Sequence, residues 1–239
     1  MALSFHWAGR RAPLLVITLL ALLLAACGGL SGEPEIVATL PPRTVPTREP
    51  AFPDRPPDLA RGALLFAENC VRCHGPNGAG DGELVLTGQV GNPGNFTEPD
   101  RARSQSPQQW FDTITNGRLE TLMPPWGESL SAQQRWDVAL YTYTLHYTPE
   151  QIARGETVWS ANCGDSCDSL PGIDSLTDQT IMTSLSDAVL RTALPPEISS
   201  EADAWAAVAY LRTRSLNNID TIGQQIAPPP AATEEVQQA

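Results

Sequence analysis

Apolar residues in the middle of the chain recur at the spacing of α-helices. One predicted helical face consists of Leu59, Ala63, Phe66 and Cys70, at positions i, i+4, i+7 and i+11. A serine followed three residues later by glutamine marks the start of two more helices, at Ser106 and Ser131, and Thr148 begins the pattern again. The inward residues that follow are Trp110 and Ile114 in the first of these helices and Trp136, Leu140, Tyr143 and Tyr147 in the second.

The segment between the first two of these helices is rich in glycine. Residues 75–100 have no alternating apolar pattern, so we expect a loop there. The short helix after Ser106 is expected to end at Gly117. The pattern as a whole predicts an all-α fold with long connections.

The helical region contains an internal duplication. Arg61-Gly62, Phe66 and Asn69-Cys70 recur with the same spacing as Arg154-Gly155, Trp159 and Asn162-Cys163. Residues 106–125 align without gaps with residues 177–196, and Trp136 and Tyr141 recur as Trp205 and Tyr210. The matches keep their order, so we expect two similar helical domains, 58–147 and 148–215.

The two ends of the chain have a different character. An apolar run from Leu14 to Ala26 is too short for a comfortable membrane-spanning helix. Leu24-Ala25-Ala26-Cys27 resembles the lipobox of bacterial lipoproteins, which implies a signal peptide (1–26), lipid on Cys27 and a chain anchored to the outer face of a bacterial membrane. An ordinary secretory signal or an uncleaved anchor is the alternative. Residues 27–57 are rich in proline and predict an extended tether, and residues 216–239 predict a disordered tail.

The charge of the chain excludes one class of partner. There are 15 basic residues, all of them arginine, against 27 acidic ones, which gives a formal net charge of −12. Nucleic-acid binding is not expected, because phosphate contacts need a basic surface. The acidic balance fits either a solubilising surface or a docking face for a basic partner.

Residues 70–74 carry the strongest chemical signal. Cys70-Val71-Arg72-Cys73-His74 has the C-x-x-C-H spacing of a c-type haem attachment site. Two thiols one helical turn apart can each bond a vinyl group of one porphyrin, and the adjacent imidazole then reaches the iron. A thioredoxin-like pair would need a βαβ context and a zinc site a second ligand pair, and neither is predicted.

Together these features resemble the class I c-type cytochromes, particularly bacterial monohaem domains and the haem-c subunits of membrane oxidases. The resemblance covers about residues 58–147, including the helix that leads into the haem motif and Met123-Pro124-Pro125-Trp126. It implies one covalent haem c on Cys70 and Cys73, with His74 as the proximal and Met123 as the distal iron ligand. Met123 could instead fill a gap in the core.

The second copy departs from the haem pattern where the iron would be held. Cys167 is followed by Asp168 rather than histidine, and Leu194 stands where the first copy has methionine. We expect a degenerate domain without haem, in which Cys163 and Cys167 can form a disulfide; a repurposed metal or redox site is the alternative.

Several other residues are weaker candidates for the site. His146 is expected on the surface or as a cap rather than as the sixth ligand, and Met182 is expected in the core. Arg118 and Trp126 either contact the porphyrin and its propionates or have ordinary surface and core roles.

These residues predict an electron carrier rather than an enzyme. Haem with histidine and methionine ligands has no open position, so the chain is expected to pass single electrons between respiratory or photosynthetic complexes, or to be a subunit of one. The alternative is a peroxidase or ligand sensor in which Met123 can be displaced. A third hypothesis is that the second copy docks the haem domain onto a complex.

Overall fold

The computed structural model describes residues 52–163 and 167–224. Within these ranges the chain forms helices and isolated β-bridges only, which confirms the all-α expectation. The first copy contains α2 (Leu59–Asn69), α3 (Val71–His74), α4 (Glu83–Leu86), α5 (Pro99–Ser104), α6 (Pro107–Asn116), η2 (Leu119–Thr121), α7 (Ala132–Tyr143) and η3 (Thr144–His146). The second contains α8 (Pro149–Asn162), α9 (Gln179–Ser184), α10 (Asp187–Ala193) and α11 (Glu201–Thr213), and η5 (Ile219–Thr221) follows in the C-terminal segment.

The predicted signal peptide, Cys27 and most of the proline-rich tether lie outside the described residues, so they stay predictions. No helix in the described part of the chain has the length and apolar character needed to cross a membrane.

Local capping starts the main helices. The side chains of Ser106 and Ser131 each accept a hydrogen bond from the backbone N–H of the glutamine three residues on, and the side-chain oxygen of that glutamine accepts one from the N–H of the cap residue. The Thr148 side chain likewise accepts from the backbone N–H of Gln151 at the start of α8. The side-chain amide of Gln151, however, donates to the carbonyl of Trp205 at 3.4 Å. This third cap therefore forms only half of the box, because a helix of the same copy competes for the glutamine.

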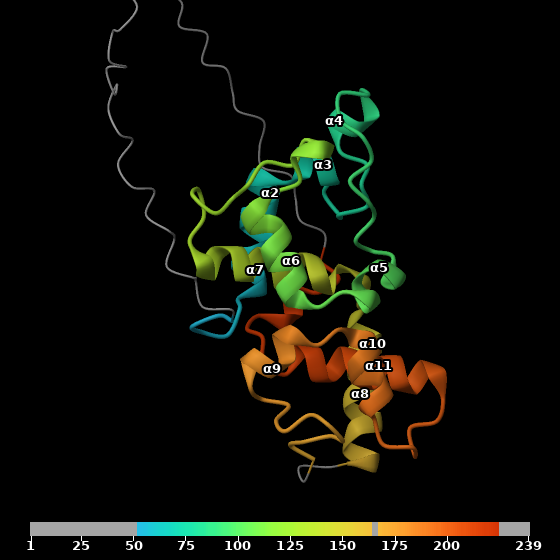
Figure 1. Ribbon diagram of the computed structural model, residues 1–239. Coiled ribbons are helices and arrows are strands. Elements are labelled where there is room, and N and C mark those ends of the chain that lie inside the picture. Colours follow the sequence, from blue (N-terminus) through green and yellow to red (C-terminus); the bar gives the residue numbers. More distant parts are fainter. Residues whose placement is uncertain (1–51, 164–166, 225–239) are drawn as a thin grey trace, which may run out of the picture. The chain divides into compact units, whose positions relative to one another are not determined.

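Each copy is built on one close helix crossing. The packed helix pairs are α2 with α7 and α8 with α11, and Figure 1 shows α8 crossing α11. Gly62 of α2 packs directly on the backbone of Asp137, and a Cβ atom there would lie 2.7 Å from the Cβ of Tyr141. Gly155 of α8 packs on Ala206, with a corresponding distance of 2.8 Å to the Cβ of Tyr210. The duplicated sequence thus makes the same crossing twice.

Two groups of buried apolar side chains form the interior. The first contains Phe66, Trp110, Trp136 and other residues of α2, α6 and α7, and the second contains Trp159, Leu190, Leu211 and their neighbours. Residues 135–143 of α7 are all buried, so this helix has no solvent face, although the sequence predicted only one inward face. The reason is that α2 and α6 both pack against it.

The predicted C-terminal tail is partly ordered, which corrects its boundary at residue 216. Asn217 donates its backbone N–H to the carbonyl of Pro57 at 2.8 Å and accepts from the N–H of Leu59 at 3.1 Å. Ile222 is 6% exposed and belongs to the first core, against which Leu216 also packs. These apolar contacts with a partner distant in sequence could not be seen in a polar local composition.

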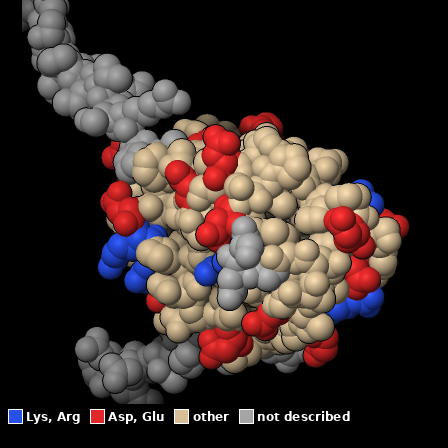
Figure 2. All heavy atoms as spheres, turned by 90° about the horizontal axis from the view of Figure 1, so that it is seen from below, with Lys and Arg blue, Asp and Glu red and all other residues tan. Residues whose placement is uncertain are grey.

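The glycine-rich segment is also less irregular than predicted. It contains the single turn α4, and α5 begins inside it at Pro99. Elsewhere on the molecule, Figure 2 shows acidic side chains spread over one face, with arginines in separate groups towards its edges.

Candidate haem site

The C-x-x-C-H motif occupies the junction of two helices. Cys70 ends α2 with a hydrogen bond from its N–H to the carbonyl of Phe66 at 2.8 Å, and it also begins α3. The N–H of His74 donates to the carbonyl of Cys70 at 2.9 Å, so the motif forms one tight turn. Gly75 ends that turn with φ of 76°, and its Cα packs so closely on Asp81 that a side chain would clash.

Three of the four predicted haem residues line one pocket with a cavity volume of about 160 Å³. These residues are Cys70, His74 and Met123. Its apolar wall includes Phe66, Phe96, Trp110, Ile114 and Val138. Cys73 is not among the lining residues and lies half-buried on α3.

The side chain of His74 is suited to binding a metal. Burial and the nearby charge of Arg101 lower the pKa of His74 to about 4, so the imidazole is neutral at pH 7. Its Nδ1 is buried and has no hydrogen-bond partner among the described residues. The ring stacks on Phe96, with 4.7 Å between centroids.

The thiols of the motif are unbonded in the structure. Burial, with a smaller contribution from Cys73, raises the pKa of Cys70 to about 12. The Cys70 thiol is therefore protonated at pH 7, and it lines the pocket.

Met123 is positioned by a short loop after α6. Gly117 ends the helix with φ of 67°, and a Cβ there would lie 2.6 Å from the Met123 carbonyl. Arg118 and Met123 exchange two backbone hydrogen bonds of 2.9 and 3.0 Å. Leu122 closes the loop in the left-handed region at φ of 61°, a conformation that costs a non-glycine residue on the order of 1 kcal/mol. The loop therefore holds the thioether-bearing residue at the pocket through its backbone.

These residues fit a haem c. No group of three or more histidine, cysteine, aspartate or glutamate side chains in the described ranges is arranged to hold a metal ion. The pocket combines a thiol, a neutral imidazole with an unpartnered buried nitrogen, a thioether and an apolar wall. Its cations, Arg101 and Arg118, are suited to the carboxylates of a porphyrin.

The structure also places the weaker candidates. Arg118 lines the pocket. Trp126 packs against the first core, and its backbone N–H donates to the carbonyl of Ile114 at 3.0 Å. Arg101 also lines the pocket and was not predicted from the sequence; its guanidinium donates to the carbonyl of Pro93 at 3.1 Å. Pro99 at the start of α5 was the available signal for the helix that carries it.

His146 is buried, which corrects the expectation of a surface position but leaves the expected capping role open. Its side chain is 1% exposed, its Nδ1 lies 2.7 Å from the carbonyl of Tyr143, and it does not line the pocket of His74. It is buried because Asp187 of the second copy lies against it. Met182 is in the second core at 2% exposed.

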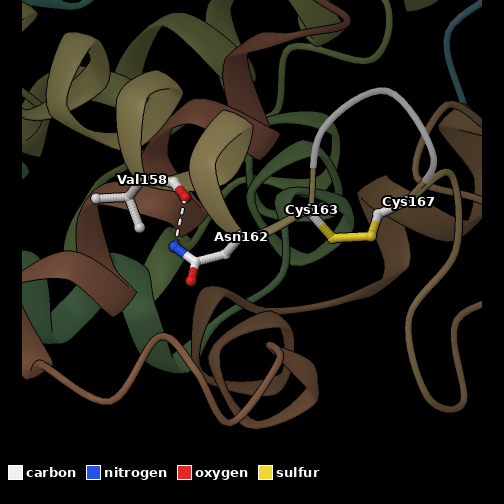
Figure 3. The surroundings of a disulfide bond; sticks show 4 residues. All are labelled: Val158, Asn162, Cys163 and Cys167. Atoms are coloured by element: carbon white, nitrogen blue, oxygen red, sulfur yellow. Dashed lines mark hydrogen bonds between the residues drawn. A yellow bond between two sulfur atoms is a disulfide. The ribbon is translucent and has the colours of Figure 1, made fainter.

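The second copy has a different arrangement at the position of the haem motif. Cys163 and Cys167 form a disulfide at the end of α8, where Asn162 donates to the carbonyl of Val158 at 2.8 Å (Figure 3). Asp168 is exposed, and Leu194 packs against the second core. The segment after Cys167 contributes three buried aliphatic side chains to that core: Leu170, Ile173 and Leu176.

Comparison with known proteins agrees with the geometry. Residues 57–141 match the family described as cytochrome c oxidase, cbb3-type, subunit III. This match, like the geometry of the pocket, supports a c-type cytochrome domain in this segment. Members of the c-type cytochrome family bind haem c covalently.

The cytochrome domain is similar to subunits of membrane oxidases. The chain is 32% identical over 120 residues to the cbb3-type cytochrome c oxidase subunit FixP of Sinorhizobium medicae, covering 46% of this chain and 38% of that one. It is 39% identical over 88 residues to FixP of a Bradyrhizobium species, covering 37% and 28%. The chain thus spans about a third of the length of these relatives.

A solved structure from the reducing HAO-like protein complex of Kuenenia stuttgartiensis aligns with this chain. The alignment covers 64% of this chain and 95% of the chain in that structure. The sequence identity is 16% and the TM-score is 0.31, which is too low to support an argument.

Proposed function

We propose that this chain is a membrane-tethered monohaem cytochrome c that carries single electrons between respiratory or photosynthetic complexes, or serves as a subunit of one. The observation that supports this proposal is the meeting of Cys70, His74 and Met123 in one apolar pocket. When bound, the haem would supply the one-electron couple, and Met123 as an iron ligand would raise its potential. Similarity to FixP subunits supports an oxidase complex as a partner.

The backbone of the Met123 loop favours a carrier over a peroxidase or sensor. The two hydrogen bonds between Arg118 and Met123 hold the methionine in place, whereas a displaceable ligand needs freedom to leave the pocket. A fixed sixth ligand leaves no position for peroxide or carbon monoxide. The chain's own residues then bind the porphyrin, hold both ligands and exclude water from the apolar wall.

One haem per chain is proposed, because the second copy lacks both axial ligand types. Asp168 and Leu194 occupy the positions of histidine and methionine, and aliphatic side chains fill the core next to Cys167. No lysine is available for the lysine ring that many cytochromes c use in docking, so the partner must recognise another surface.

The test is a pyridine haemochrome assay on the full chain, expressed with a cytochrome c maturation system. We expect one haem per chain, loss of covalent haem in the double variant Cys70→Ala/Cys73→Ala, and retention of it in the matched variant Cys163→Ala/Cys167→Ala. Two haems would contradict the monohaem proposal, and none would contradict the haem site itself. Carbon monoxide binding to the ferrous protein would favour the sensor alternative.

The lipid anchor is proposed from the sequence around Cys27 alone. Replacement of the modified thiol should release the protein from the membrane, because stable anchoring requires the acyl chains. Membrane fractionation of Cys27→Ser against the parent chain measures this. A variant that stays in the membrane fraction would overturn the lipobox assignment.

A further inference from the structure

A buried polar cluster lies where the two copies meet, outside the pocket that binds the haem. The first copy contributes Tyr143, His146 and Tyr147, and the second contributes Asp187 and Arg212. The Asp187 side chain is 0% exposed and that of Arg212 is 2% exposed. None of these residues is needed to attach haem or ligate iron.

Asp187 is the centre of this cluster. Its Oδ1 accepts from the Tyr143 hydroxyl at 3.0 Å and from the Nε and Nη2 of Arg212 at 3.0 and 2.9 Å. Its Oδ2 accepts from the Tyr147 hydroxyl at 2.5 Å and lies 3.5 Å from Nε2 of His146. Burial raises the pKa of Asp187, but the charge and hydrogen bonds of Arg212, His146 and Tyr147 outweigh burial. The net pKa is lowered, so the carboxylate is ionised.

Arg212 anchors this carboxylate within the second copy. Its guanidinium also donates to the backbone carbonyls of Met182 and, at 2.8 Å, Leu185. Asp187 is therefore held at a defined position by its own copy, and it presents a fixed acceptor to the two tyrosines of the other copy.

Tyr143 connects this acceptor to the wall of the haem pocket. Its hydroxyl lies 3.0 Å from the carbonyl of Gln105 as well as from Asp187. Its ring contacts Trp110 edge-on, with centroids 5.5 Å apart. Gln105 and Trp110 both line the pocket. Trp110 in turn contacts Phe96, at 5.0 Å between centroids.

We propose that the second copy acts on the haem site through Asp187, a positioning residue that holds Tyr143 and thereby Gln105 and Trp110 in the pocket wall. This inference rests on the proposed function, because it concerns the haem environment. It gives the copy without haem a role in the same site. Tyr147 makes a hydrogen bond to the same carboxylate, and its ring contacts His146, which does not line the pocket, so it offers a matched control.

The physical consequence is a change in the reduction potential of the haem. Burial and the apolar shell around a metal site control solvent access and local dielectric, and these set its potential. Without the Tyr143 hydroxyl, Gln105 and Trp110 in the pocket wall would move more freely and admit more water. Water stabilises the more highly charged ferric state of the haem. The midpoint potential is therefore expected to fall.

The experiment is a double-mutant cycle on the full-length holoprotein, read out by spectroelectrochemical titration. Tyr143→Phe is expected to lower the midpoint potential, whereas Tyr147→Phe leaves it at the wild-type value. Asp187→Asn is expected to shift the potential by different amounts in the wild-type and Tyr143→Phe backgrounds, but by the same amount in the wild-type and Tyr147→Phe backgrounds.

A merely structural role would lower the melting temperature of both tyrosine variants and leave both potentials unchanged, and this result would overturn the inference. So would additive effects of Asp187→Asn and Tyr143→Phe. Wild-type protein without haem would instead refute the proposed function.

A second measurement applies if Tyr143→Phe does not fold. Hydrogen exchange of the peptide spanning residues 105–110 is expected to be faster in Asp187→Asn than in wild type. It is expected to be unchanged in Asp203→Asn, which alters the more exposed Arg154–Asp203 pair of the same copy. Equal exchange in Asp187→Asn and wild type would overturn the inference.

Discussion

Single residues decide whether the pocket can hold an iron centre. Burial lowers the pKa of His74 and so keeps its imidazole neutral. Two backbone hydrogen bonds to Arg118 hold Met123 in position. The side-chain types were readable in the sequence, because C-x-x-C-H and Met-Pro-Pro are local motifs. Arg101 was not, since its role depends on a loop that brings it to His74 from a distant position.

Met123→Leu tests the sixth ligand. Leucine keeps the apolar volume but has no thioether, so the ferric protein should lose its methionine–iron charge-transfer band and the midpoint potential should fall. Absorption spectroscopy and a redox titration measure both. Met182→Leu is the control, because Met182 is buried in the second core, and it should retain the wild-type spectrum. An unchanged spectrum in Met123→Leu would rule out Met123 as the ligand.

Pairs of helices set the framework on which these residues are mounted. The crossing of α2 with α7 places Cys70 at the end of one helix and Val138 and Thr142 of the other around the same pocket. The amphipathic spacing and the capping boxes predicted these helices well. The complete burial of α7 was not predictable, because it depends on packing from several sides.

Gly62→Ala tests the crossing. A methyl group there would clash with the backbone of Asp137, so we expect a loss of about 1–3 kcal/mol in unfolding free energy. Gly155→Ala should cost a similar amount in the second copy. Gly91→Ala is the control, since no atom lies within 4 Å of the added carbon. Chemical denaturation measures all three, and wild-type stability in Gly62→Ala would contradict the close crossing.

At the scale of the whole molecule, the two copies share buried contacts. Ala209 from the second copy, together with Leu216 and Ile222 of the C-terminal segment, belongs to or packs against the first core. The cluster around Asp187 joins the copies by buried hydrogen bonds. Separation of the copies would expose these apolar side chains to water and break the hydrogen bonds of Tyr143 and Tyr147 to Asp187, so it is disfavoured.

We therefore expect one cooperative unfolding transition for both copies. Differential scanning calorimetry of the holoprotein should show a single peak that coincides with the loss of the haem Soret signal. Deletion of residues 148–239 should lower the melting temperature of the haem domain, since it removes part of the first core. Two separate transitions would contradict this coupling.

The sequence by itself determined the helices and the duplication and predicted the chemistry of the site, because periodicity, capping and the C-x-x-C-H spacing are local properties. Only the tertiary structure decided that Cys70, His74 and Met123 share a pocket, that His146 is buried and that Ile222 returns to the first core. These outcomes depend on contacts between residues far apart in the chain, and no local pattern records which side chain will cover another.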